Sequence, residues 1–177
     1  MKLTNNNCIN SIIHCFINIK ELIEFFLSKK NYIKNYKLSN VFLKIIKNKE
    51  KNINNLEKLA YEMNPSFKNI ENNDPKDLVL FLIETMHKEL TVVTNINKYR
   101  DDRIDIYNID TCFQSYENYF KNNFRSIFSN IFYGRYDNQS KFIHKANFTS
   151  HNIQYFKILV FPIDEVKNYI SKILIIK

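Results

Sequence analysis

The residues that could carry covalent chemistry are three cysteines and four histidines: Cys8, Cys15, Cys112, His14, His87, His144 and His151. Cys8 and Cys15 lie in the stretch LTNNNCINSIIHCF (residues 3–16), where an apolar run begins. A thiolate nucleophile needs a histidine base at about 2.6–3.2 Å and a third group that orients the base. A helix N-terminus favours such a thiolate, because the helix dipole lowers the thiol pKa. Cys8 is therefore the first candidate for a nucleophile.

The sequence lacks the residues that phosphate-binding loops and metal sites require. The chain has one glycine, so it cannot form a glycine-rich phosphate loop of either common kind. Its cysteines and histidines do not form a cluster of four ligands, so we expect neither a metal nor a cofactor. Cys15 and Cys112 then read as small buried hydrophobic residues, and the odd cysteine count indicates reduced thiols.

Hydrophobic periodicity predicts which elements position these residues. Period 3.6 predicts helices over 8–17, 19–28, 38–48, 53–62, 74–90 and 113–124, with a further helical segment over 164–177. The helix at 74–90 has the clearest start, because Asp74 is a natural N-cap and Pro75 suits the first helical position. Residues rich in Ile, Phe, Tyr and Val predict strands over 126–136, 140–148 and 153–163. The fold class predicted is α+β, with helices first and antiparallel strands after them.

The net charge of +8 is concentrated in one block. Residues 29–58 contain nine lysines and two glutamates, and so hold seven of the eight net positive charges. Such a block could bind nucleic acid. Its alternation with apolar residues from Leu38 to Ile46 instead favours the solvated face of an amphipathic helix. No leader or stretch of about 20 apolar residues is seen, so we expect no membrane span and a location in the cytoplasm or nucleus.

Two stretches resemble the ubiquitin-specific protease family. NPSFKNIENNDPKDLVLFLIETMHKEL (residues 64–90) aligns without gaps with the family pattern N-P-x-F-x-G-Y-x-Q-Q-D-A-x-E-F-L-x-x-L-L-D-x-L-H-E-E-L. SIFSNIFYGRYDNQSKF (residues 126–142) is similar to S-I-I-S-x-L-F-x-G-x-x-x-S-x-x-x-C and places the only glycine, Gly134, on the pattern's glycine. The resemblance implies a truncated, papain-like domain over 1–177. Residues 1–125 would form a helical thumb, and residues 126–177 the strands of the fingers and palm.

The resemblance also assigns the nucleophile's position. The family's first box, L-G-N-T-C-[YF]-M-N-S-x-L-Q-x-L, aligns without gaps with residues 3–16 and places Asn7 where the cysteine belongs. Cys8 takes that position only if a residue is deleted before Asn10, which would rotate the rest of the helix by about 100°. The family's oxyanion asparagine would fall on Lys2, or on Leu3 in the gapped alternative. No confident catalytic residue follows: the position reads Asn7, with Cys8 as the runner-up.

The remaining family features are missing or altered. The late G-H-Y-x-x-Y box is absent, and His151 with Tyr155 four residues later is a weak substitute. The two C-x-x-C zinc pairs are absent, and the resemblance makes His87 a structural histidine. Asn73 and Asp74 match the positions that bind the ubiquitin tail, although Asp74 is also explained as an N-cap.

Three functions remain open at the level of sequence. The first is a pseudoenzyme, a non-catalytic module that binds ubiquitin, a ubiquitin-like protein or another protein partner, as catalytically dead family members do. The second is an active cysteine-type deubiquitinase fragment with Cys8 as the nucleophile. The third is a basic helical nucleic-acid-binding module, which the amphipathic pattern of the lysine block disfavours. The oligomeric state is not predicted.

Overall fold

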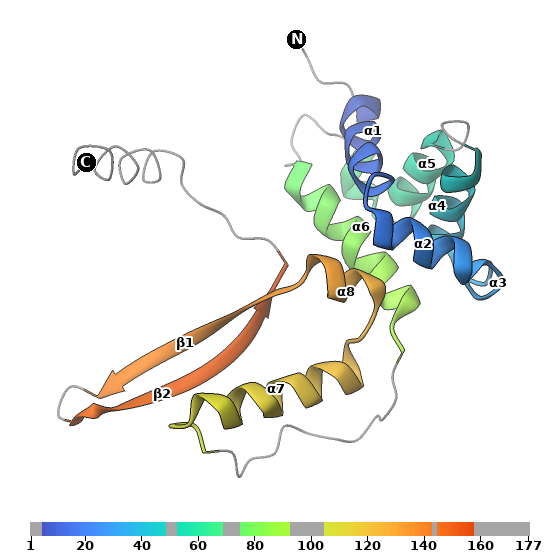
Figure 1. Ribbon diagram of the computed structural model, residues 1–177. Coiled ribbons are helices and arrows are strands. Elements are labelled where there is room, and N and C mark those ends of the chain that lie inside the picture. The colour runs from blue at the N-terminus through green and yellow to red at the C-terminus, as the bar shows by residue number, and fades with distance from the viewer. Residues whose placement is uncertain (1–4, 49–52, 69–74, 93–104, 143–144, 158–177) are drawn as a thin grey trace, which may run out of the picture.

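The computed structural model describes residues 5–48, 53–68, 75–92, 105–142 and 145–157. Within these ranges a helical part comes first and an antiparallel two-stranded sheet follows (Figure 1). The helices are α1 (Asn5–Phe16), α2 (Lys20–Ser28), α3 (Lys30–Ile33), α4 (Lys37–Asn48), α5 (Ile53–Met63), the 3-10 helix η1 (Pro65–Lys68), α6 (Pro75–Leu90), α7 (Ile109–Asn123) and α8 (Ile127–Phe132). The strands are β1 (Gly134–Phe142) and β2 (Lys145–Phe156). The α+β class predicted from the sequence is confirmed.

The main core joins α1, α2, α4, α5, α6 and α8. At its centre lie four buried phenylalanines, Phe16, Phe26, Phe42 and Phe128. Phe42 meets Phe26 edge to face with 4.9 Å between ring centroids, and meets Phe16 in the same way at 6.2 Å. Such pairs contribute about 0.5–1.5 kcal/mol each beyond the area they bury. These aromatic contacts tie helices that lie far apart in the sequence into one body.

Helix α4 confirms the amphipathic interpretation of the lysine block. Leu38 and Phe42 are completely buried on its inner face, whereas Lys37, Lys44 and Lys47 are exposed. Lysine side chains on the outer face keep their charges in water while the apolar face packs inward.

The prediction of a strand over 126–136 was wrong for its first half, which forms α8. Ser126 starts this helix with a reciprocal cap: its Oγ accepts from the Ser129 amide at 3.1 Å, and its own amide donates to Ser129 Oγ at 2.9 Å. Two orphan donors are thereby satisfied at the helix start. Phe128 of α8 is then buried in the main core. Aromatic and β-branched composition favoured a strand here, but the cap and core packing make the segment helical.

A second, smaller cluster joins α7 to the sheet. It contains Cys112, Tyr116, Phe120 and Ile153. Helix α7 begins after Asn108, whose Oδ1 accepts from the amides of Asp110 (3.0 Å) and Thr111 (3.2 Å). Strands β1 and β2 pair from Gly134 with Phe156 to Lys141 with Thr149, and an irregularity follows Lys141.

At the base of the hairpin the ring of Phe156 covers Gly134. A Cβ added at Gly134 would lie 2.3 Å from Phe156 Cζ. The ring could not keep its place over any other residue, which gives the single glycine a packing role.

Among the described residues, no helix combines the length and apolar character that a membrane crossing requires. The predicted helix at 164–177 and the end of the predicted strand at 153–163 lie outside the described residues.

Candidate functional site

The two residues competing for the nucleophile position both lie in the first turn of α1. Asn7 is the third residue of this helix and Cys8 the fourth. Their side chains lie outside the described part of the structure. Helix α1 is continuous, and its inner face consists of Ile9, Ile12, Ile13 and Phe16, all of which are buried in the main core. The burial of this face fixes the rotation of α1 relative to the core.

Helix α6 holds the other predicted site position at its start. It begins at Pro75, directly after Asn73 and Asp74, which lie outside the described residues. Helices α1 and α6 contact each other, and both begin at the end of the helical part that is remote from α8 (Figure 1). The two starting turns therefore belong to the same end of the molecule.

His87 lies near the opposite end of α6 and is buried. Its Nδ1 is 2.7 Å from Ser126 Oγ, and its ring lies 5.0 Å from the ring of Tyr133, measured between centroids. Burial, with the nearby Lys157 ammonium as a smaller cause, lowers the pKa of His87 from 6.5 to about 4. His87 is thus a neutral group that links α6 to the cap of α8. This position agrees with the structural role that the sequence implied for it.

Glu89 joins α6 to the start of α4. Its Oε1 accepts from the Leu38 amide at 2.9 Å, and its Oε2 accepts from the Ser39 amide at 2.8 Å and from Ser39 Oγ at 2.6 Å. A carboxylate at a helix N-terminus satisfies orphan amides and interacts favourably with the dipole. Sequence reasoning gave Glu89 no role, because its partners lie about fifty residues earlier in the chain.

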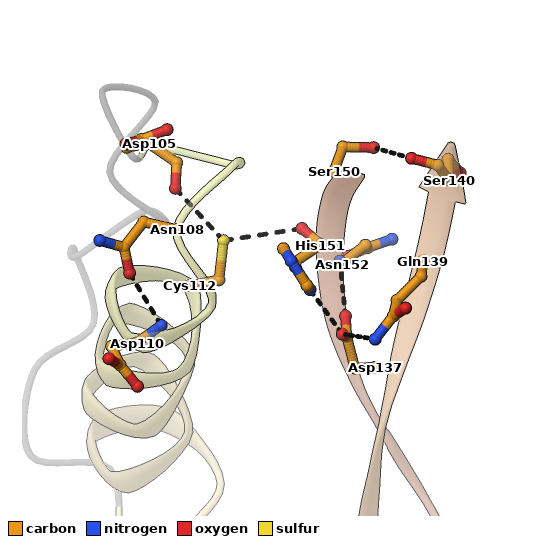
Figure 2. Close-up of polar contacts among 10 residues, drawn as sticks. All are labelled: Asp105, Asn108, Asp110, Cys112, Asp137, Gln139, Ser140, Ser150, His151 and Asn152. Atoms are coloured by element: carbon orange, nitrogen blue, oxygen red, sulfur yellow. Dashed lines mark hydrogen bonds and ion pairs between the residues drawn. The ribbon is translucent and has the colours of Figure 1, made fainter. Parts of the chain in front are cut away.

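The described residues also contain a carboxylate–imidazole pair, on the hairpin (Figure 2). His151 Nδ1 is 2.6 Å from Asp137 Oδ2, and Asp137 also accepts from the Asn152 amide (3.1 Å) and from Gln139 Nε2 (3.0 Å). Hydrogen bonding, chiefly to His151, holds the pKa of Asp137 below its usual value. A carboxylate that orients a histidine is one half of the arrangement that activates a nucleophile.

The thiol nearest to this pair is not placed to complete it. Cys112 Sγ donates to the backbone carbonyls of Asp105 (3.5 Å) and His151 (3.6 Å), as Figure 2 shows. The His151 amide in turn donates to the Ile106 carbonyl at 2.8 Å. Cys112 therefore meets the backbone of β2, and the cluster attaches the segment before α7 to the hairpin. A buried thiol in such a place is structural.

Two further sequence predictions have clear outcomes. Cys112 is buried as expected, but Cys15 is exposed, so its interpretation as a buried hydrophobic residue was wrong. Cys15 falls on the solvent side of α1, since the inner face is already filled by Ile9, Ile13 and Phe16.

No group of three or more potential metal ligands occurs among the described residues. His144 lies outside them.

Comparison with models of known families gives a match. The family model described as ubiquitin carboxyl-terminal hydrolase matches residues 1–159, which is most of the chain. No curated protein matches it. The matched range includes the first turn of α1, the start of α6 and the whole hairpin.

Proposed function

The chain belongs to the ubiquitin carboxyl-terminal hydrolase family, and from this we propose that it is a non-catalytic module that binds ubiquitin. Asn7 stands at the nucleophile's position in the ungapped alignment with the family's first box. An asparagine amide cannot ionise to a nucleophile or form a thioester, so peptide-bond cleavage through this position is not available. The folded domain would then bind ubiquitin without cleaving it.

The burial of α1 is the observation that carries this proposal. In the ungapped alignment the family's apolar positions fall on Ile9, Ile13 and Phe16, which form the buried face of α1. The family's cysteine stands two residues before the first of these apolar positions, where this chain has Asn7. Cys8 stands one residue before it, a position about 100° around the helix from that of Asn7. Bringing Cys8 to the angular position of Asn7 would require turning the buried face out of the core.

For ubiquitin binding we propose a role for the start of α6. Asp74 matches the family position that contacts the extended ubiquitin tail, and Asn73 precedes it. One carboxylate oxygen of Asp74 can cap the helix while the other accepts an N–H from the tail. This assignment is supported by the arrangement of α1 and α6, which contact each other and begin at the same end of the helical part, so the tail would pass on the side of the first turn of α1 (Figure 1).

Covalent labelling tests the absence of catalysis. Ubiquitin that carries an electrophile at its C-terminus should form no adduct with the protein, as judged by intact mass. An adduct that disappears in Cys8→Ala would establish Cys8 as the nucleophile and the chain as a deubiquitinase.

A titration followed by NMR tests binding. The protein should shift the signals of the C-terminal tail of ¹⁵N-labelled ubiquitin, and Asp74→Ala should weaken binding several-fold. Asp74→Ser retains the cap but removes the carboxylate. Weak binding by the serine variant would support the tail contact, whereas full binding would leave Asp74 a cap only. Asp77→Ala, on an exposed position of the same first turn, is the matched control. Unchanged ubiquitin spectra at all concentrations would contradict the proposal.

A further inference from the structure

A large groove lies at the end of α6 that is opposite to Asp74. It encloses about 870 Å³ between α2, the end of α6, α7 and α8. Leu90, the last residue of α6, lines it, so about 24 Å of helix separates the groove from the start of α6. Its volume is within the roughly 300–1,000 Å³ that is typical of ligand sites. The groove is therefore distinct from the proposed position of the ubiquitin tail.

The floor of the groove is apolar and open to solvent. Leu90, Ile127 and Phe25 line it beside two exposed side chains, Tyr32 (43% exposed) and Val92 (55% exposed). Apolar side chains that gather in an exposed hollow mark a surface that a partner covers. The aliphatic side chains of Leu90, Val92 and Ile127 form a place for an apolar anchor side chain.

The rim of the groove is positively charged. Lys29, Lys121 and Arg125 line it, and none of the described residues that line it is acidic. Lys121 Nζ lies 3.5 Å from Oε2 of Glu117, one turn earlier on α7. Lys29 and Arg125 form no ion pair or side-chain hydrogen bond with any described residue. This contrasts with Arg135, which is paired with Glu117 close by.

We propose that this groove binds a short acidic peptide segment that inserts an apolar side chain between its carboxylates. Carboxylates would pair with Lys29 and Arg125, since arginine offers a fork that matches a carboxylate. A peptide fits better than a single-stranded nucleic acid, because three of the five apolar lining residues, Leu90, Val92 and Ile127, are aliphatic, whereas bases bind by stacking on aromatic faces. The ring of Tyr32 already meets that of Tyr36 edge to face at 5.1 Å, and the two hydroxyls are hydrogen-bonded at 2.6 Å.

Selection from a random-peptide phage library on the immobilised 177-residue chain tests the proposal. The peptides recovered should be enriched in Asp and Glu around a hydrophobic residue. Their synthetic, fluorescein-labelled forms should bind with an affinity that falls as salt rises. Lys29→Glu combined with Arg125→Glu should weaken binding by about tenfold or more, since both rim charges are reversed. Val92→Asp should weaken it as well, and its exposure means that folding should be unaffected.

The matched control is Lys47→Glu combined with Lys58→Glu, which changes the net charge equally at exposed positions outside the groove. This variant should bind the peptides like the wild type. All variants should bind ubiquitin unchanged, so a failure here is distinguishable from a failure of the proposed function. Recovered peptides without acidic residues, equal weakening in the control, or tighter groove-dependent binding of poly-uridylate RNA would overturn the proposal.

Discussion

Under the proposed non-catalytic function, Asn7 is the residue whose replacement would come closest to supplying a nucleophile. Asn7→Cys would put a thiol in the first turn of α1, where the dipole favours the thiolate. We nevertheless predict that this variant does not hydrolyse a ubiquitin–fluorophore conjugate above background. A leaving amine needs a general acid, and an oxyanion needs a donor whose loss costs about 2.7–4 kcal/mol in a comparable hydrolase. Lys2 falls on that donor's position in the ungapped alignment.

The described histidines supply no base for such a thiol. His14 lies seven residues after Asn7 on the same helix, about 10 Å further along its axis. His87 is buried at the far end of α6, and His151 is held by Asp137 on the hairpin. Asn7→Ser, which cannot form the same thiolate, is the control for contaminating activity. Repeated turnover by Asn7→Cys but not by Asn7→Ser would refute the prediction that this chain lacks a catalytic base.

His87 should make stability depend on pH. Its folded-state pKa of about 4 lies below the ordinary 6.5, so the unfolded state binds the proton more readily. The stabilisation is complete above pH 6.5 and is lost as the pH falls towards 4. Urea unfolding should show a lower free energy of unfolding at about pH 5 than at about pH 7. His87→Gln, which can still meet Ser126, should flatten this dependence. An unchanged slope in that variant would assign the dependence to other groups.

At the scale of elements, Glu89 determines how firmly α4 is attached to α6. Glu89→Ala would leave two amides and the hydroxyl of Ser39, a completely buried residue, without their acceptor. Each unsatisfied buried group costs about 1–3 kcal/mol, so the loss of the acceptor for three groups should lower the free energy of unfolding by about 3 kcal/mol or more. Urea unfolding measures this, with Glu62→Ala at an exposed position of α5 as the control. A loss no larger than in the control would show that α4 does not need this acceptor.

Periodicity predicted the elements whose apolar stripe is unambiguous. The helices expected over 8–17, 19–28, 38–48, 53–62 and 74–90 agree with α1, α2, α4, α5 and α6 within a few residues. Periodicity did not predict α8, which was expected to be a strand. The segment IFSNIF has strand-like composition, and only the Ser126–Ser129 cap and its packing make it a helix.

Contacts between distant segments could not be predicted in the same way. The bonds of Glu89 to the start of α4 and of His151 to Asp137 depend on how helices pack and on strand register. A local sequence pattern contains no information on helix packing or strand register. The charged rim of the groove also escaped notice, since only Lys29 belongs to the lysine block while Lys121 and Arg125 come from α7 and the segment after it. The site positions Asn7, Cys8, Asn73 and Asp74 stay predictions.

At the scale of the whole molecule, the described residues pack into two hydrophobic clusters of unequal size. The larger contains twenty buried residues and the smaller four, so the hairpin and α7 have less apolar burial to hold them. We predict that amides of α7 and β2 exchange with deuterium faster than those of α1 and α6, measured by mass spectrometry under native conditions. Equal protection throughout would show that the molecule opens only as one unit.

Tyr133 packs against both clusters. Its ring lies 5.0 Å from His87 of α6 and stacks on Tyr155 of β2 at 5.5 Å, measured between centroids. This arrangement can couple the two clusters thermodynamically, because binding that orders β2 would also fix the Tyr133 side chain, which contacts His87 of α6. A partner that binds the hairpin would then make local opening of the helical core less favourable, so the measured stability of the core would depend on whether the hairpin is bound.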